Sequence, residues 1–282
     1  MPLVTSKQML LDAQAGKYGV GAFNIENMEM AQAAVAAAVA CRSPILLQTT
    51  PSTLKYADCI LFLANVRTLA EDASVPVAMH LDHGNSFDLA MHAFRSGYTS
   101  IMIDGSKLPF EENIALSRRV AEACHGGGVP VEAELGMVGG KEDSLDNGDV
   151  DIYTDPDQAA EFAVRTGVDF LAVGIGTAHG IYKGEPRLDL DRLADIRSKV
   201  DIPLVLHGTS GVPDATVQEC IQRGICKINY ATDLRIAYTK GVRQVLEDPS
   251  VFDPKKYGAA GRKLVQEYVE ARIRMCGSAG KA

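Results

Sequence analysis

The residues best suited to chemistry lie in the short stretch 80–84, which reads HLDHG. This stretch follows the apolar run 75–79, so it stands where a buried strand would end. A carboxylate can transfer a proton, and a neutral imidazole can transfer a proton or bind a metal ion. An acid between two imidazoles at a strand end therefore predicts a catalytic or metal-binding site.

Four of the six histidines follow or end predicted strands: His80, His83, His179 and His207. If the strands are parallel and close into a barrel, these strand ends meet at one mouth. His83, His179 and His207 could then form a three-imidazole site with an open coordination position, as a catalytic divalent metal ion requires. Their placement alone leaves open that they are hydrogen-bonded structural residues.

Carboxylates fall at the same predicted mouth, namely Asp82, Asp104, Glu132 and Glu134. Glu132 and Glu134 are two residues apart, so they share one face of a strand. Burying two acids there is costly unless they accept hydrogen bonds or contact a cation. Ordinary helix caps and salt bridges remain the alternative interpretation.

A long polar segment with several glycines follows Glu134, over residues 136–149. A long loop of this kind after a barrel strand suits a mobile lid that delivers an acid to the site. Glu142 is the predicted base on this lid. A merely solvated loop is the alternative.

Two loops late in the chain suit phosphate binding. Residues 208–211 read GTSG after the seventh predicted strand, and residues 229–233 read NYATD between the eighth strand and its helix. Backbone amides near helix N-termini bind phosphate, and barrels frequently bind it between these two loops. Gly180 and Lys183, just after His179, could add an amide and a positive charge.

These residues must be positioned by an alternation of short apolar strands and longer helical patterns. The predicted strands are 18–24, 44–49, 75–80, 100–104, 129–134, 169–174, 203–207 and 225–229. The predicted helices are 28–40, 57–73, 86–96, 111–124, 156–166, 190–200, 214–223, 232–246 and 262–275. The strands are continuously apolar, which is typical of a parallel sheet buried on both faces.

Eight such units predict a (β/α)8 TIM barrel, in the α/β class, as a single domain over residues 1–282 with a C-terminal helical extension. A doubly wound sheet is the weaker alternative, because no GxGxxG follows the first strand. Since barrels support many chemistries, the function has to come from the strand ends.

Composition excludes some classes of function. The chain has 282 residues, 46% of them hydrophobic, enough for one large core. Its formal net charge of -8 argues against a nucleic-acid partner. No run of about 18 apolar residues occurs, so no membrane span is expected. The six cysteines lack a CxxC pair, which predicts reduced, buried thiols and a cytoplasmic location.

Six motifs occur in order between residues 80 and 233, and the match to which they belong covers nearly the whole chain. They are HLDHG at 80–84, VEAELG at 131–136, GGKED at 139–143, GTAHGIYKGEP at 176–186, LHGTSG at 206–211 and KINYATD at 227–233. Together they resemble the class II, metal-dependent ketose-1,6-bisphosphate aldolases. Among these enzymes the chain is most similar to the shorter tagatose-bisphosphate and fructose-bisphosphate aldolases.

The resemblance implies that His83, His179 and His207 bind a catalytic Zn2+ ion, with another divalent metal, or an additional monovalent cation, left open. It implies that Asp82 exchanges a proton with the C4 hydroxyl, and that Glu142 exchanges the proton at the glycerone phosphate carbon. Cleaving a carbon–carbon bond beside a carbonyl leaves negative charge that a Lewis acid stabilises.

The resemblance also implies supporting roles. Glu134 matches a position of an alternative metal site, and Glu132 matches a support for the ligands. Asn24 and Thr50 match polar positions on the substrate side. Residues that match the region around the glycerone phosphate group are Gly180, Lys183, Gly208, Ser210, Asn229 and Thr232.

The distal phosphate has a less direct candidate. Some relatives have an arginine soon after an Asp-Pro pair, whereas residues 253–262 here read DPKKYGAAGR. Arg262 is therefore the predicted ligand, acting across a subunit boundary in a homodimer or homotetramer.

The implied reaction is reversible cleavage of a ketohexose 1,6-bisphosphate to glycerone phosphate and D-glyceraldehyde 3-phosphate. D-tagatose 1,6-bisphosphate is the predicted substrate, and fructose 1,6-bisphosphate, which differs at C4, is the alternative. 6-Phospho-5-dehydro-2-deoxygluconate is a third.

Two other hypotheses remain at this point. A Schiff-base aldolase could use Lys227, which shares strand parity with Asn229 and so could face the barrel interior. A barrel that binds sugar phosphates without catalysis is the second. We also expect the chain to leave regular strand geometry at Asp82 and His83, because neighbours in a strand point to opposite faces.

Overall fold

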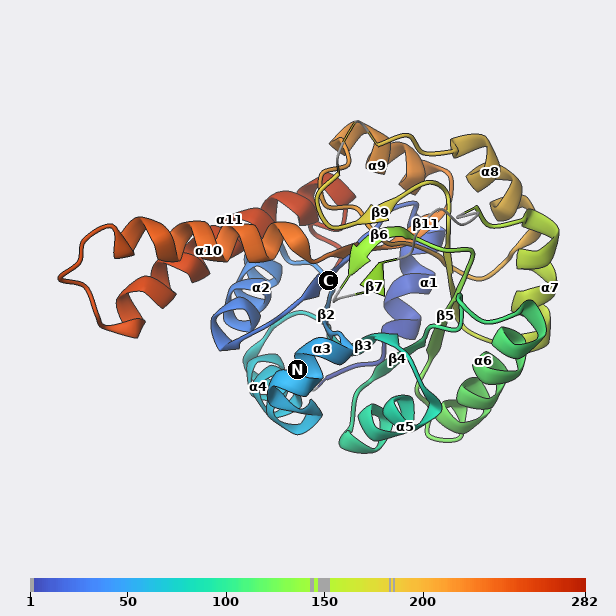
Figure 1. The fold of residues 1–282 in the computed structure, drawn as a ribbon, viewed down its shortest axis with the longest axis horizontal. Coiled ribbons are helices and arrows are strands. Elements are labelled where there is room, and N and C mark those ends of the chain that lie inside the picture. Colours follow the sequence, from blue (N-terminus) through green and yellow to red (C-terminus); the bar gives the residue numbers. More distant parts are fainter. Residues whose placement is uncertain (1–2, 143–144, 147–152, 183, 185) are drawn as a thin grey trace.

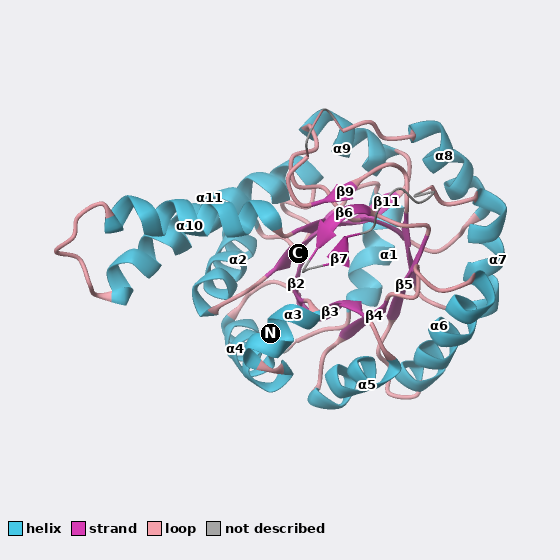
Figure 2. Ribbon diagram, in the orientation of Figure 1, coloured by secondary structure: helices cyan, strands magenta, loops and turns pink. Residues whose placement is uncertain are grey.

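The computed structural model describes residues 3–142, 145–146, 153–182, 184 and 186–282, with only the backbone described over 139–142 and 145–146. Eight parallel strands close into a barrel surrounded by helices, which confirms the predicted (β/α)8 TIM barrel (Figures 1 and 2). Around the barrel the order is β1, β11, β10, β8, β5, β4, β3 and β2. These strands are β1 (Val20–Asn24), β2 (Ile45–Thr49), β3 (Val77–Gly84), β4 (Ser100–Ile103), β5 (Val131–Leu135), β8 (Phe170–Val173), β10 (Leu204–Leu206) and β11 (Ile225–Tyr230).

The helices are α1 (Ser6–Gly16), α2 (Met28–Cys41), α3 (Pro51–Ala57), α4 (Cys59–Asp72), α5 (Phe87–Ser96), α6 (Phe110–His125), α7 (Pro156–Thr166), α8 (Leu190–Lys199), α9 (Asp214–Gln222), α10 (Thr232–Leu246) and α11 (Pro254–Cys276). Side chains cap several N-termini: Asn27 accepts a hydrogen bond from the Met30 amide of α2, and Ser86 accepts one from the Leu89 amide of α5. α7 and α10 have the predicted bounds.

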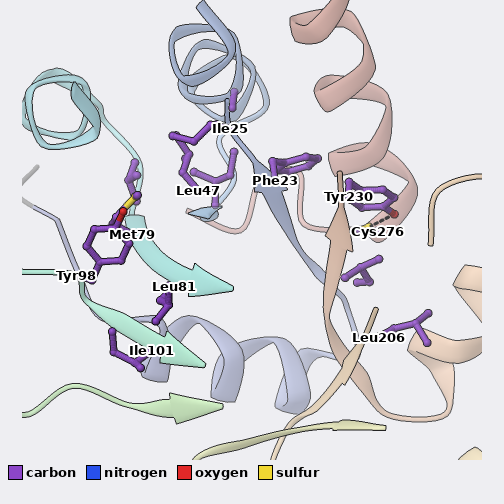
Figure 3. Packing of buried hydrophobic residues seen from close by; sticks show 14 of the residues in the cluster. Phe23, Ile25, Leu47, Met79, Leu81, Tyr98, Ile101, Leu206, Tyr230 and Cys276 are labelled. Carbon is purple, nitrogen blue, oxygen red and sulfur yellow. Dashed lines mark hydrogen bonds between the residues drawn. The ribbon is translucent and has the colours of Figure 1, made fainter. Parts of the chain in front are cut away.

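The core has two layers because both faces of the strands are buried. Figure 3 shows part of the outer layer, in which Phe23, Leu47 and Leu81 of the strands pack towards the helices. The inner layer, at the amino-terminal ends of the strands, includes Val20, Leu46, Ala78, Phe170 and Val205.

Helix α1, which the sequence pattern did not predict, completes the inner layer. Its buried residues Met9, Leu10 and Ala13 belong to the same inner cluster. The helix therefore closes the end of the barrel opposite the strand ends that carry the predicted site (Figure 1).

Strand β3 departs from regular geometry where the chemistry is expected. It runs four residues beyond its predicted end, so 80–84 lie within it rather than after it. Its pairing with β4 shifts register between Leu81 and Gly84, and His83 has a φ of +48°. The predicted departure at Asp82 and His83 is therefore confirmed, and it lets both side chains reach the same site.

Three further elements differ from prediction. The predicted helix 57–73 corresponds to α4, and an unpredicted helix, α3, precedes it and meets it at Asp58, which has a φ of +40°. α11 begins eight residues earlier than predicted, and α10 and α11 form an arm that projects beyond the barrel (Figure 1).

The third difference lies in the predicted lid. It contains short strands β6 (Gly139–Glu142) and β7 (Leu145–Asp146), and β6 also pairs with β9 (Ala178–His179).

None of the helices that the structure describes has the length and apolar composition of a membrane span.

Candidate active site

The three predicted metal ligands converge at the carboxyl ends of the barrel strands. His83 lies near the end of β3, His179 ends β9, and His207 directly follows β10. Each offers one ring nitrogen, and these three atoms lie within 4.8 Å of one another. His83 Nε2 and His207 Nδ1 are 2.8 Å apart. The sequence prediction of a three-histidine cluster therefore agrees with the geometry.

Carboxylates hold the other nitrogens of two of these rings. His83 Nδ1 lies 2.9 Å from Asp104 Oδ2, and His207 Nε2 lies 2.9 Å from Glu132 Oε1. A neutral imidazole that donates to a carboxylate presents a lone pair at its other nitrogen. The two lone pairs then face each other across 2.8 Å, so the rings are placed to share one cation. The donor set therefore fits a divalent metal ion.

Burial favours the neutral form of the His207 ring, which is the form that binds metal. Burial, then the neighbouring imidazole of His83 and the ammonium of Lys227, hold the pKa of His207 well below its usual value. For Asp104, burial opposes ionisation, but hydrogen bonds from His83 and Ser106 outweigh it and lower its pKa. A neutral ring and an ionised partner are the states needed for ligation.

Glu134 lies where the sequence prediction put an alternative metal site. Its Oε2 is 3.8 Å from His83 Nδ1 and 3.8 Å from His207 Nδ1. His83, Asp104 and Glu134 form a second group whose ligand atoms lie within 4.8 Å of one another. A cation could therefore occupy either of two positions that share His83.

Asp82 is fully buried beside the histidines and is held by three side-chain amides. Asn24 Nδ2 and Gln48 Nε2 donate to its Oδ2 at 2.9 and 3.2 Å, and Asn229 Nδ2 donates to Oδ1 at 3.0 Å. Both carboxylate oxygens are thus fixed in direction. Gln48 was not predicted from the sequence, although its place near the end of β2 is a signal of the same kind as that of Asn24.

A pocket beside this cluster gathers most of the residues predicted for phosphate. It is lined by Asn24, His179, Gly180, Gly208, Thr209, Ser210, Asn229, Ala231, Thr232 and Arg235. Helix α10 begins at Thr232, so its first backbone amides lie at the pocket and favour an anion.

Arg235 is the pocket residue that the sequence analysis overlooked. Its Nε donates to Glu26 Oε1 at 2.8 Å, and Glu26 Oε2 accepts from Thr53. An arginine in the first turn of a helix that starts at a phosphate-binding loop indicates a phosphate ligand, so Arg235 could have been predicted from the sequence. It gives the pocket a cation that suits phosphate.

Close packing joins the two loops that form the pocket. Gly208 has a φ of +64°, and a Cβ on it would meet the backbone of Ala178 at 2.8 Å. Tyr182 accepts from the Ala178 amide at 2.8 Å and donates to the Gly208 carbonyl at 2.7 Å. The position of His179 therefore depends on Gly208.

The remaining predicted residues lie elsewhere. Thr50 is fully buried, and its hydroxyl bonds Ser52 and Thr53. Arg262 lies exposed on α11, where it donates to Gln32 of α2 at 3.0 Å. Neither lines the pocket formed by the described residues. Lys183 and the side chain of Glu142 lie outside what the structure describes.

Comparison with known proteins decides the family. The family model described as fructose-bisphosphate aldolase class-II matches residues 4–281. The chain belongs to this family. It is a class II aldolase, a metal-dependent lyase, as the motifs predicted.

Individual relatives agree with this assignment. A protein of Geobacillus stearothermophilus named fructose-bisphosphate aldolase is 46% identical over 286 residues, covering 100% of this chain and 99% of that protein. The solved YdjI aldolase of Escherichia coli K12 has a TM-score of 0.89 at 37% identity, with 99% of each chain covered. A putative fructose-1,6-bisphosphate aldolase of Coccidioides immitis has a TM-score of 0.91 at 31% identity, covering 97% of this chain and 96% of that one.

Family membership also removes the Schiff-base hypothesis. That mechanism needs an amine that reaches the substrate. Lys227 is fully buried, its ammonium contacts Glu132 and Asn229, and it does not line the pocket.

Proposed function

We propose that the protein is a zinc-dependent aldolase that reversibly cleaves fructose 1,6-bisphosphate to glycerone phosphate and D-glyceraldehyde 3-phosphate. The observation that carries this proposal is the three-histidine cluster, with Asp82 beside it and an anion pocket that shares His179 and Asn229. Such a site can bind a metal ion that stabilises negative charge, transfer a proton through Asp82 and bind a phosphate group in the pocket.

His83, His179 and His207 would hold the metal ion, and Glu134 would offer its second position. When bound, the ion acts as a Lewis acid that stabilises the negative charge developing beside the substrate carbonyl. Imidazole ligands favour Zn2+ among the divalent metals of a catalytic site with an open position.

Asp82 takes the proton of the C4 hydroxyl during cleavage and returns it to the aldehyde oxygen during condensation. The three amides around it keep its carboxylate in one direction throughout. Glu142, carried on the segment between β5 and α7, exchanges the proton at the glycerone phosphate carbon. Pairing between β6 and β9 joins this segment to the backbone of His179.

The pocket anchors the phosphate of the glycerone half. The α10 amides, Ser210 and the backbone at Gly180 and Gly208 supply neutral donors, and Arg235 supplies positive charge. Lys183, which lies outside the described residues, stays a prediction for the same phosphate. Thr50 and Arg262 stay predictions for the rest of the substrate. Arg262 would act from a second subunit in a homodimer or homotetramer, and the cytoplasmic location also stays a prediction.

The substrate proposal differs from the sequence-based preference for tagatose 1,6-bisphosphate. The name of the 46% identical relative supports fructose, whereas the motifs HLDHG, GTAHG and NYATD supported tagatose. The two sugars differ at C4, the position at which Asp82 acts.

The test measures kcat/KM for three substrates on one zinc-loaded preparation, with the third being 6-phospho-5-dehydro-2-deoxygluconate. We expect fructose 1,6-bisphosphate to exceed the others by at least about 10-fold, a difference of about 1.4 kcal/mol. A higher value for tagatose 1,6-bisphosphate would restore the sequence-based preference. Cleavage of none of the three would overturn the proposed function.

A further inference from the structure

Lys227 is a fully buried lysine in the interior of the barrel. It lies in β11, beside the candidate site, and its side chain has no exposed surface. Lysine is almost never fully buried unless its charge is paired. Its contacts therefore indicate what the charge does there.

One contact leads to the metal cluster. Lys227 Nζ lies 3.0 Å from Glu132 Oε2 and 3.3 Å from Glu132 Oε1. Glu132 Oε1 in turn lies 2.9 Å from His207 Nε2, and both partners are fully buried. The ammonium thus neutralises the carboxylate that fixes the ring of His207.

A polar chain from the opposite end of the barrel meets the same carboxylate. Ser6 of α1 donates to Ser100, and the Ser100 hydroxyl lies 2.7 Å from His80 Nδ1. His80 Nε2 is 3.6 Å from Glu132 Oε2. Lys227 contacts both oxygens of Glu132, and His207 lies on Oε1, so these two partners fix the carboxylate while His80 lies close to it without a hydrogen bond.

The other contact of Lys227 leads to Asp82. Lys227 Nζ donates to Asn229 Oδ1 at 2.7 Å. Because the amide oxygen of Asn229 accepts from the ammonium, its Nδ2 must point the opposite way, and it donates to Asp82 Oδ1 at 3.0 Å. Lys227 therefore decides which way this amide faces.

We propose that Lys227 is a positioning residue that sets both halves of the active site, the imidazole of His207 through Glu132 and the carboxylate of Asp82 through Asn229. The inference rests on the proposed function. It replaces a nucleophilic role for Lys227 by an electrostatic one, in which a single buried charge couples metal binding to proton transfer.

The central experiment replaces Lys227 by methionine, which keeps the length of the side chain and removes its charge. Metal-free K227M is titrated with Co2+ and Zn2+, and we expect the metal dissociation constants to rise about 10- to 100-fold. Loss of carbon–carbon cleavage should exceed loss of proton exchange at the glycerone phosphate carbon by at least about 10-fold, because Asp82 serves only cleavage.

A matched control is Lys199→Met. Lys199 pairs with Asp157 at 2.6 Å on the surface, with 36% of its side chain exposed. We expect K199M to keep the metal affinity and both rates of the wild type.

A second variant covers the case in which K227M does not fold with Glu132 left unneutralised. The double variant K227M/E132Q removes both charges and keeps an acceptor for His207. We expect its metal affinity to return to within about 10-fold of the wild type, while cleavage stays low because Asn229 still lacks its partner.

Two results would overturn the proposal. One is wild-type metal affinity together with an unchanged ratio of cleavage to exchange in K227M. The other is full recovery of cleavage in K227M/E132Q. That result would mean that Lys227 only neutralises the charge of Glu132 and does not orient Asn229. A wild-type protein that cleaves no ketose bisphosphate would refute the proposed function, whereas the Co2+ titrations would still decide the link to His207.

Discussion

Single residues carry the chemistry because each has a partner that fixes its direction. His83 and His207 each have a carboxylate behind the ring, and Asp82 has three amides around it. Types and spacing in the sequence marked the three histidines and Asp82 as candidates, since all follow or end apolar strands, and the family resemblance supplied their roles.

Their partners were harder to predict. Gln48, Ser100 and Lys227 come from three strands, and which of them touch depends on the register around the closed barrel. A single sequence does not contain that register. Glu132 was identified as a support only through the family resemblance.

Replacing His207 by alanine tests the metal cluster at this scale. The variant loses one ligand and leaves Glu132 without its imidazole, so we expect metal affinity to fall at least about 100-fold and activity with it. Metal content after dialysis and kcat/KM are the measurements. His125→Ala, at an exposed histidine on α6 that lies 2.7 Å from Asp169 and in none of the possible metal groups of the described residues, is the matched control and should retain both.

Asp82→Ala tests the proton carrier separately from the metal. The histidines are unchanged, so the variant should retain the metal while kcat for cleavage falls about 10²- to 10⁴-fold. Stopped-flow or coupled assays give kcat, and metal analysis gives the occupancy. Loss of metal together with activity would mean that Asp82 acts mainly as a ligand or a structural support.

At the scale of elements, the apolar strands were predictable and the irregular segments were not. Each barrel strand has two buried faces, so its composition alone marked it. α1 was not predicted because it follows no strand and precedes the first β/α unit. The break between α3 and α4 depends on a positive φ at Asp58. Glycine usually marks such a position in a sequence, and none is present here.

Gly208→Ala tests how one loop positions another. Gly208 combines a φ of +64° with the Ala178 backbone at 2.8 Å from the added Cβ. We expect a loss of about 1–3 kcal/mol in the free energy of unfolding and weaker metal binding, because β9 must move with His179.

Gly167 provides the comparison. It has a φ of +67° but nothing within 4 Å of an added Cβ. Gly167→Ala should therefore lower stability by about 1 kcal/mol and leave metal affinity intact. Equal metal affinity in both variants would show that the contact with Ala178 does not position His179.

Asp169, next to β8, ties α1 and α6 to the barrel and gives a pH-dependent test. It pairs with Lys7 at 2.8 Å and His125 at 2.7 Å, and accepts from the Val131 amide at 2.8 Å. Burial raises its pKa, but Lys7, Val131 and His125 outweigh burial, so its pKa lies below the usual value.

A carboxyl with a lowered folded-state pKa stabilises the fold above its unfolded pKa of about 4, and that contribution disappears as pH falls through the folded value. Asp169→Asn should therefore cost about 1–3 kcal/mol in urea unfolding at pH 7 and progressively less below pH 4. Asp157→Asn, at an exposed ion pair, should have little effect at either pH. A cost for Asp169→Asn that does not change with pH would contradict the assignment.

At the scale of the whole molecule, the barrel, the reaction class and the order of motifs could all be read from the sequence. The barrel followed from repeated β/α units, and the reaction class followed from six motifs in order. The α10–α11 arm was predicted only as an extension, and its exposed Phe252 and Arg262 give no direct contact with the pocket formed by the described residues.

The proposed function requires a histidine-bound metal ion for aldol cleavage. The direct measurement is fructose 1,6-bisphosphate cleavage by protein stripped with a chelator and then titrated with Zn2+, with borohydride trapping performed in parallel. We expect loss of activity on stripping, recovery that is complete at one Zn2+ per chain, and no trapped substrate. Full activity in the stripped protein, with substrate trapped on a lysine, would contradict it.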